Sequence, residues 1–220
     1  MILMCGFGCR TTTKVVKILA NIPISNKSNG NQNFVANVIL MNNEDALFYA
    51  NQLGLPALDM GAAHSKPDGY LGVDQYENPN VDIVCDVTEG IPLPDSSVGA
   101  IRAYDFIEHI PDGVALFNEF YRVLAPGGLL LIQVPSSDGR GAYQDPTHVT
   151  FYNENSFWYY TDPFYQKFVP TITCRFEALS LQTVYPSEWH ATHNISYVFA
   201  DLKAIKQAPA KAFFQITEMA

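Results

Sequence analysis

Four aspartates in the first half of the chain each end or directly follow a short apolar run. They are Asp59 in "LPALDM", Asp74 in "YLGVD", Asp86 in "VDIVCD" and Asp105 in "IRAYD". Any one of them alone could instead cap a helix or start a turn. A carboxylate offers two oxygens to a vicinal diol such as that of a ribose, so four of them at successive strand ends favour a ligand that contains a nucleoside. The turn "GAA" after the first strand would let such a ligand approach, because Gly61 tolerates a positive φ.

Two histidines and a further acid could move a proton. His148, in "YQDPTHVTFY", is expected in a loop beyond the fifth strand, where it could act as a general base with Asp145 to orient it. The alternative is that His148 only ties down its own loop. His109, in "FIEHIPD", is a second catalytic candidate, although a histidine near a helix end is often a cap. The neighbouring Glu108 is expected to be structural.

The elements that would position these residues alternate between strand and helix. Residues 42–53 carry a helix start signal in Asn42 and Asn43, and Gly54 is a stop signal. Apolar residues recur at helical spacing after 110, and "APGG" is expected to end that helix, which gives a βαβ unit. Short apolar runs predict strands that are buried on both faces at 57–60, 70–73, 81–85, 101–104 and 129–134.

The pattern changes after Pro135. A polar loop is followed by an aromatic helix candidate at 153–160 and by two strand-like runs at 175–185 and 193–202. A short connection between these last two runs predicts that they pair antiparallel. The expected fold is an α/β three-layer sandwich with a mainly parallel twisted sheet and a carboxyl-terminal antiparallel hairpin. Its domain would span 42–202, between an amino-terminal arm at 1–41 and a tail at 203–220.

Charge and cysteine content restrict the partners. The net charge is −9, and the first 43 residues carry four basic residues and no acid, so the rest of the chain is strongly acidic. Such a surface repels polyanions, which argues against a nucleic-acid partner. The four cysteines form no CxxC pair, so no metal site is expected. Reduced thiols, and apolar runs too short to cross a membrane, predict a cytoplasmic protein.

The amino-terminal stretch "MILMCGFGCRTTTKVVKILA" also has a strand, a Gly-x-Gly turn and a helix in order, as a dinucleotide-binding fold would. That fold expects an acid about 20 residues further on to hold the ribose. The first acid in this chain is Glu44, which disfavours a nicotinamide enzyme. The segment is expected to pack on the main body or on a neighbouring subunit, so a homo-oligomer stays open.

Over residues 55 to 160 the blocks "ALDMGAAHSKPDGYLGVDQY", "VDIVCDVTEGIPLPDSSVGAIRAYDFIEHIPD", "FNEFYRVLAPGGLLLIQVPSS" and "DPTHVTFYNENSFWYY" follow one another. This series resembles the class I S-adenosylmethionine-dependent methyltransferases, and most closely a small bacterial and phage-type group with a D-P-T-H segment. The resemblance implies a Rossmann-like, seven-stranded fold and S-adenosylmethionine as the cofactor. It implies cofactor contacts from Asp59, Gly61, Ala62 and Ala63 at the methionine end, Asp74 at the ribose, Asp86 and Val87 at the adenine, and Asp105 on the sulfonium side.

The first turn departs from the family's usual pattern. Only Gly61 remains of three customary glycines, and nine residues, 61–69, join two strands that a longer crossover usually connects. The family's first helix is therefore expected to be reduced to a turn or two, with a weaker cofactor site.

The resemblance also bears on the acceptor. The Asn/Asp-Pro-Pro-aromatic tetrapeptide of enzymes that methylate amino groups in nucleic acids is absent, and the chain has "YDFIEH" in its place. Methyl transfer to a small-molecule acceptor, such as a sugar or metabolite hydroxyl, is the favoured hypothesis. The alternative is a catalytically weak or inactive relative that serves as an interaction partner.

Overall fold

The structure is a computed structural model, and it describes residues 40–63 and 65–206. The Gly-x-Gly turn near the amino terminus, Cys5 and Cys9 lie outside these ranges, as do residues 207–220. Within the described ranges, no helix combines the length and the apolar character needed to span a bilayer.

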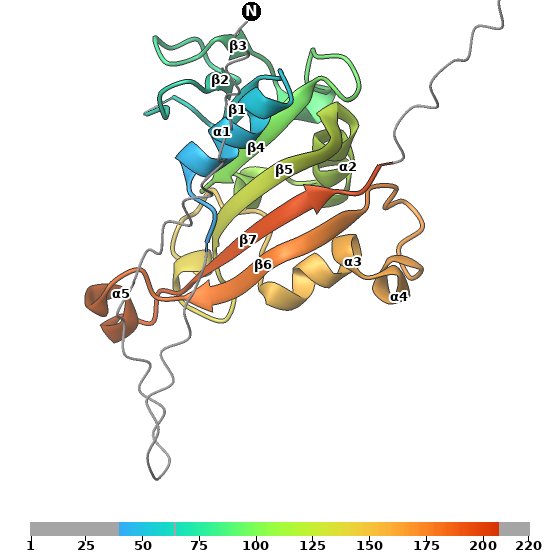
Figure 1. Ribbon diagram of the computed structural model, residues 1–220. Helices are drawn as coiled ribbons and strands as arrows, with labels where there is room; N and C mark the ends of the chain where they lie inside the picture. Colours follow the sequence, from blue (N-terminus) through green and yellow to red (C-terminus); the bar gives the residue numbers. More distant parts are fainter. Residues whose placement is uncertain (1–39, 64, 207–220) are drawn as a thin grey trace, which may run out of the picture. The chain divides into compact units, whose positions relative to one another are not determined.

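Seven strands form one sheet in the order β3-β2-β1-β4-β5-β7-β6 (Figure 1). The strands from β3 to β5 run parallel, and β7 is antiparallel to both β5 and β6. The predicted mainly parallel sheet with an antiparallel carboxyl-terminal pair is confirmed. The strand bounds are β1 Ala57–Met60, β2 Leu71–Asp74, β3 Ile83–Val84, β4 Val98–Tyr104, β5 Leu124–Pro135, β6 Phe176–Val184 and β7 Tyr197–Ala204.

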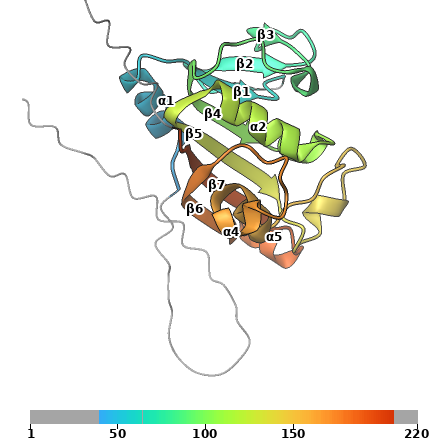
Figure 2. The same cartoon turned by 90° about the vertical axis from the view of Figure 1, so that its right-hand side faces the viewer.

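Helices lie on both faces of this sheet (Figure 2). Successive side chains of a strand point to opposite faces, so Leu58 of β1 joins the core that α2 covers, whereas Ala57 joins the cluster under α1. The α-helices are α1 Asn43–Gln52, α2 Gly113–Val123, α3 Trp158–Thr161, α4 Pro163–Gln166 and α5 Glu188–Thr192. Short 3₁₀ turns are η1 Val87–Glu89, η2 Ile107–His109, η3 Gly141–Tyr143 and η4 Glu154–Phe157.

The bounds of α1 follow from the capping residues that the sequence shows. The Asn42 side chain accepts a hydrogen bond from the Asp45 N–H, which satisfies one of the free amides of the first turn. The chain leaves the helix through Gly54 at φ +67°. The helix predicted for 42–53 is confirmed.

The segment "APGG" does not separate helix from strand as expected. Helix α2 ends at Val123, and β5 begins at the next residue, Leu124, so that Gly127 at φ +80° lies inside the strand. The pairing of β4 with β5 shifts register at this point, between Val98 and Ala100. A bulge accommodates the extra residues, and glycine permits its left-handed backbone.

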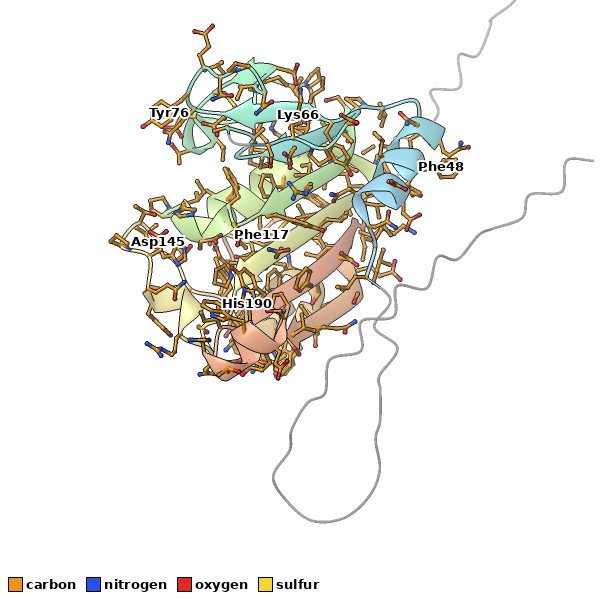
Figure 3. The ribbon with its side chains drawn as sticks, turned by 90° about the vertical axis from the view of Figure 1, so that its left-hand side faces the viewer. Phe48, Lys66, Tyr76, Phe117, Asp145 and His190 are labelled. Carbon is orange, nitrogen blue, oxygen red and sulfur yellow. The ribbon has the colours of Figure 1, made fainter. Side chains whose placement is uncertain are left out.

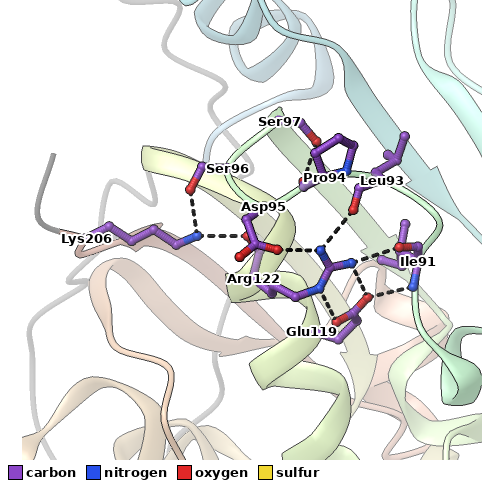
Figure 4. A network of polar contacts seen from close by, with 9 residues as sticks. All are labelled: Ile91, Leu93, Pro94, Asp95, Ser96, Ser97, Glu119, Arg122 and Lys206. Carbon is purple, nitrogen blue, oxygen red and sulfur yellow. Dashed lines mark hydrogen bonds and ion pairs between the residues drawn. The ribbon is translucent and has the colours of Figure 1, made fainter. Parts of the chain in front are cut away.

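A polar network fastens the segment between η1 and β4 to α2 (Figure 4). The Arg122 guanidinium donates to the Glu119 carboxylate, to Asp95 Oδ1 at 2.7 Å, and to the carbonyls of Ile91 and Leu93. Hydrogen bonds from Arg122 hold the pKa of Glu119 below its usual range. One arginine thus satisfies the backbone of a loop that has no secondary structure of its own.

The connection between β6 and β7 is longer than predicted. Residues 185–196 lie between the two strands and contain α5, so the two strands do not form a tight hairpin. The aromatic segment predicted as one helix at 153–160 is divided into η4 and α3. Its buried members Phe157 and Tyr160 pack against Phe117 of α2, with Tyr160 stacked at 4.0 Å between ring centroids. These two aromatic residues belong to the core.

Candidate active site

The carboxyl ends of parallel strands β1, β2, β3 and β4 meet at one edge of the sheet. Gly61 follows β1, Asp74 ends β2, and Asp105 follows β4. Figure 3 shows Tyr76, which lies two residues after Asp74, and Asp145 on the same side of the molecule, away from Phe48 of α1. Ligands of open α/β sheets bind at this edge.

The first turn of the edge is short. Gly61 adopts φ +75°, and the amides of Gly61 and Ala62 both donate to the Val73 carbonyl, at 2.9 and 3.3 Å. The described residues between Met60 and Leu71 contain turns and no helix, which confirms the predicted reduction of the first helix. Ala62 is buried, whereas Ala63 is half-buried.

Gly61 is also required by its neighbour Phe106. A Cβ at Gly61 would lie 3.0 Å from Phe106 Cδ2, a closer approach than ordinary packing allows. Phe106 directly precedes η2, so it connects the first turn to the segment that carries His109.

Asp59 is paired rather than free. Its side chain is 1% exposed and accepts a 2.5 Å hydrogen bond from Arg102 Nη1 on the adjacent strand β4. Burial raises the pKa of Asp59, although the hydrogen bond and the charge of Arg102 act in the opposite direction. Arg102 in turn lies 4.0 Å from the Tyr104 ring centroid. Arg102 was not among the predicted site residues, although a lone arginine inside an otherwise apolar strand indicates a buried partner for its charge.

Two of the predicted cofactor contacts lie at the ends of β2 and β3. Asp74 is half-buried, and its Oδ1 accepts from the Tyr76 N–H at 3.0 Å. Asp86 is exposed and caps η1 by accepting from the side chain and backbone of Thr88, which lower its pKa. Within the described ranges only Oδ1 of Asp86 is engaged, so Oδ2 stays available to a ligand. The adjacent Val87 is buried.

Asp105 turns the chain out of β4. Its backbone is left-handed, with φ 47°, a conformation that aspartate tolerates better than most residues. The Gln133 side chain donates to Asp105 Oδ2 at 3.2 Å, and the Asp105 N–H donates to the Gln133 carbonyl at 2.9 Å. Strained backbone of this kind clusters at functional sites.

The two histidines come together at this edge. The rings of His109 and His148 lie 5.0 Å apart between centroids, although 38 residues separate them in the sequence. Hydrogen bonds from the amides of Val149 and Thr150 to the Glu108 carbonyl, at 2.9 and 3.1 Å, hold the second loop on η2.

A different group from the predicted one orients His148. Its Nδ1 lies 2.9 Å from the Ala142 carbonyl oxygen, which can only accept, so Nδ1 carries the proton and Nε2 is free. Asp145 instead accepts from the side chain and amide of Thr147, and Thr147 contacts His109 Nδ1 at 3.1 Å. Asp145 therefore acts on His109 through Thr147.

Glu108, expected to be structural, completes the cluster. Its residue surface is 2% exposed, and Oε1 lies 3.9 Å from His148 Nε2. Neither carboxylate oxygen has a hydrogen-bond partner among the described residues. Burial, together with the nearby charges of Asp105 and Asp145, raises the pKa of Glu108 to about 8. No sequence pattern revealed this, because the burial of η2 depends on the distant 145–150 loop.

Comparisons with known proteins show sequence similarity over part of the chain. Residues 58–132 match a family described as a methyltransferase domain. A probable S-adenosylmethionine-dependent methyltransferase of Mycolicibacterium smegmatis is 38% identical over 74 residues, which cover 32% of this chain and 29% of that protein. A probable S-adenosylmethionine-dependent methyltransferase of Mycobacterium tuberculosis is 34% identical over 74 residues, 32% of this chain and 27% of its own length. The matched region thus spans less than a third of these curated relatives.

Among solved structures, the fold is similar to a chain in the complex between the Haloferax volcanii Trm112 methyltransferase activator and a putative methyltransferase. The TM-score is 0.50 at 10% identity, with 74% of this chain and 92% of that chain covered. The match of residues 58–132 and the seven-stranded sheet order both support the predicted likeness to the class I S-adenosylmethionine-dependent methyltransferases.

Proposed function

We propose that this protein transfers the methyl group of S-adenosylmethionine to a hydroxyl of a small molecule, such as a sugar or another metabolite. The observation that carries the proposal is the position of the His109 and His148 pair. Both follow the parallel strands at the sheet edge where the family binds its cofactor, and Phe106 joins this pair to the Gly61 turn.

The residues at this edge fit the cofactor. Gly61 is exposed and has φ +75°, and Phe106 fills the side of the turn where a Cβ would point, so a ligand would meet the turn through its remaining exposed backbone. Asp74 would hold the ribose hydroxyls, and Asp86 with Val87 would flank the adenine. Gly61, Ala62 and Ala63 would border the methionine end and Asp105 the sulfonium side, whereas the buried Asp59, paired with Arg102, would contribute its charge rather than a direct contact. When bound, the cofactor supplies an electrophilic methyl group on a sulfonium.

The protein's contribution would then be positioning and proton removal. Methyl transfer is an in-line displacement, so its rate depends on the alignment of the acceptor oxygen and on the loss of the hydroxyl proton. His148 Nε2 is the proton acceptor in this proposal, because the Ala142 carbonyl fixes the ring with Nδ1 protonated. His109 lies beside His148 and would assist in proton removal. Asp145 would hold His109 in place through Thr147.

Two features support a small acceptor. The body of the chain is acidic, which disfavours a nucleic acid. The cluster is formed by side chains that are mostly buried, since the side chain of His148 is 8% exposed and that of Glu108 is 3% exposed. A compact hydroxylated molecule suits such a site better than a polymer does.

Cofactor binding tests the first half of the proposal. S-adenosylhomocysteine at 100 times its dissociation constant should stabilise the fold by about 2.7 kcal/mol in a thermal-shift titration, whereas NAD should have no effect. Asp74→Ala should remove the response, and Asp68→Ala, which changes an exposed aspartate, should keep it. Absence of any response at millimolar concentration would reject the cofactor and favour a fold relative that acts as an interaction partner.

His148→Ala tests the second half. Removal of a general base slows turnover by about 10²–10⁴-fold, and cofactor binding should persist. Turnover can be followed as S-adenosylhomocysteine release with a panel of small hydroxylated acceptors. His193→Ala, at an exposed position on α5's carboxyl-terminal side, is the matched control. Unchanged turnover in His148→Ala would show that this histidine only anchors its loop.

A further inference from the structure

The carboxylate of Glu108 is the least compensated group in the described part of the chain. It is almost fully buried, yet neither Oε1 nor Oε2 accepts a hydrogen bond there. Buried polar side chains nearly always have a partner, so an exception calls for a ligand or another explanation. A buried carboxylate can be compensated by a cation that it coordinates.

Two nitrogen ligands stand beside it. One ligand atom from each of Glu108, His109 and His148 can be chosen so that all three lie within 4.8 Å of one another. The distance from His148 Nε2 to Glu108 Oε1 is 3.9 Å. Ligand atoms about 2.1 Å from a shared cation lie about 3.0–3.4 Å apart, so a closure of about 1 Å or less would complete this pair.

The hydrogen bonds around the histidines already select the ligating nitrogens. His148 Nδ1 donates to the Ala142 carbonyl at 2.9 Å, which leaves the lone pair on Nε2. His109 Nδ1 lies 3.3 Å from the Thr147 carbonyl and 3.1 Å from Thr147 Oγ1, whose own proton goes to Asp145 at 2.6 Å. Outer contacts of this kind fix the tautomer of histidines that bind metals.

We infer that Glu108, His109 and His148 form a binding site for one divalent first-row transition cation, through a Glu108 carboxylate oxygen and the two Nε2 atoms. Two imidazoles and one carboxylate suit Zn²⁺, Fe²⁺, Mn²⁺ or Co²⁺, whereas Mg²⁺ and Ca²⁺ prefer ligand sets made only of oxygen. Three protein ligands leave coordination positions for water or for an oxygen of a bound molecule. The cysteine spacing predicts no metal site, but this site uses no cysteine.

The competing explanation is a Glu108 that stays protonated and neutral. The raised pKa of Glu108 agrees with that explanation in the absence of a cation. A neutral carboxyl could donate its proton to His148 Nε2, but the 3.9 Å between this nitrogen and Glu108 Oε1 is too long for a hydrogen bond. Cation binding satisfies the carboxylate and both imidazoles at once, and the two explanations differ in whether the protein takes up metal.

A bound cation changes how the acceptor would be activated, and this step rests on the proposed methyl transfer. The cation would hold the acceptor oxygen at an open position and lower the pKa of its hydroxyl. With the cation bound, His148 would be a ligand, and the hydroxyl proton, made more acidic by the cation, would pass to solvent water; without the cation, His148 Nε2 would be the proton acceptor as proposed above. The expected acceptors are therefore hydroxylated molecules with two adjacent oxygens, because such molecules can chelate the cation and would bind most tightly at this site.

Metal titration of the full chain tests the inference without any methyl acceptor. Protein stripped with a chelator is titrated with Co²⁺, and uptake is followed by visible absorption and calorimetry. One equivalent should bind to the cluster. Glu108→Gln, His109→Ala and His148→Ala should each weaken binding by at least about 10-fold, whereas His193→Ala should not change it.

Circular dichroism of each variant separates a lost ligand from a lost fold, and His109→Ala changes a half-buried side chain that the fold should tolerate. No uptake at millimolar Co²⁺, or equal uptake by the parent protein and all three ligand variants, would overturn the inference. The S-adenosylhomocysteine thermal shift is measured separately. Cofactor binding without metal uptake would reject only the metal site, and metal uptake without cofactor binding would reject only the proposed methyl transfer.

Discussion

Arg102→Met removes the only charged partner that hydrogen-bonds Asp59 in the described residues and keeps a side chain of similar length. Asp59 is 1% exposed, so its carboxylate cannot exchange the lost partner for water. It must then stay charged and unpaired or take up a proton. Loss of one partner from a buried ion pair typically destabilises a protein by about 3–5 kcal/mol.

The free energy needed to protonate Asp59 sets an upper limit on the destabilisation by Arg102→Met, and this limit depends on pH. To neutralise a carboxyl whose ordinary pKa is 3.8 requires at most about 4 kcal/mol at pH 7 and about 2 kcal/mol at pH 5, at about 1.4 kcal/mol per unit. The contact of Arg102 with the Tyr104 ring, at 4.0 Å, adds about 0.5–1 kcal/mol at either pH. The destabilisation should therefore be roughly twice as large at pH 7 as at pH 5.

Urea unfolding at the two pH values, followed by circular dichroism, measures this difference. The double variant Asp59→Asn/Arg102→Met leaves no charge to compensate, so its stability should depend less on pH. Asp82→Asn is the matched control, because it breaks a more exposed ion pair with Lys66, leaves Arg102 and Lys66 in place near Asp59, and should cost much less stability. An Arg102→Met destabilisation that is below 1 kcal/mol at pH 7, or is equal at both pH values, would refute the argument that Arg102 compensates Asp59.

Two further predictions concern stability. Asp201 of β7 accepts from the Met41 N–H at 2.8 Å, and burial raises its pKa from 3.8 to about 6. The folded protein therefore binds a proton at Asp201 more tightly than the unfolded chain does. The contribution of Asp201 to the free energy of unfolding falls as the pH rises from about 4 to 6. Asp201→Asn keeps an acceptor for Met41 and should be more stable than the parent by up to about 3 kcal/mol at pH 7, with no gain near pH 3.5, in paired thermal melts. A gain of equal size at both pH values would contradict the raised pKa. Gly72→Ala would place a Cβ 2.1 Å from the Asn80 carbonyl oxygen, so it should destabilise the fold by about 1–3 kcal/mol or more. A melting temperature unchanged within error would show that the 74–82 loop moves aside freely.

The parts of the fold that the sequence predicted are those set by local patterns. Asn42 and Gly54 bound α1 because capping depends on neighbouring residues. The apolar run at 57–60 gave the bounds of β1, since a strand buried on both faces needs continuous apolar residues. The predicted strand at 81–85 shrinks to Ile83–Val84, because only two residues pair with β2 at that sheet edge.

The features that escaped prediction depend on contacts between distant segments. "APGG" has the composition of a turn, but its pairing with β4 makes it part of a strand. Arg102 and Asp59 are 43 positions apart, and only the register of β1 with β4 brings them together. The burial of Glu108 needs the loop around His148, and the histidine pair follows from the same contact. Residue types in the site were visible in the sequence, whereas their partners were not.

The position of β7 bears on the order in which the sheet can be assembled. β7 is the last described strand to be synthesised, but it lies in the interior of the sheet between β5 and β6. While the ribosome still holds that segment, β5 has an open edge and β6 has no neighbour to pair with. Unpaired strand edges promote aggregation. The nascent chain therefore stays vulnerable until nearly the whole domain has emerged from the exit tunnel.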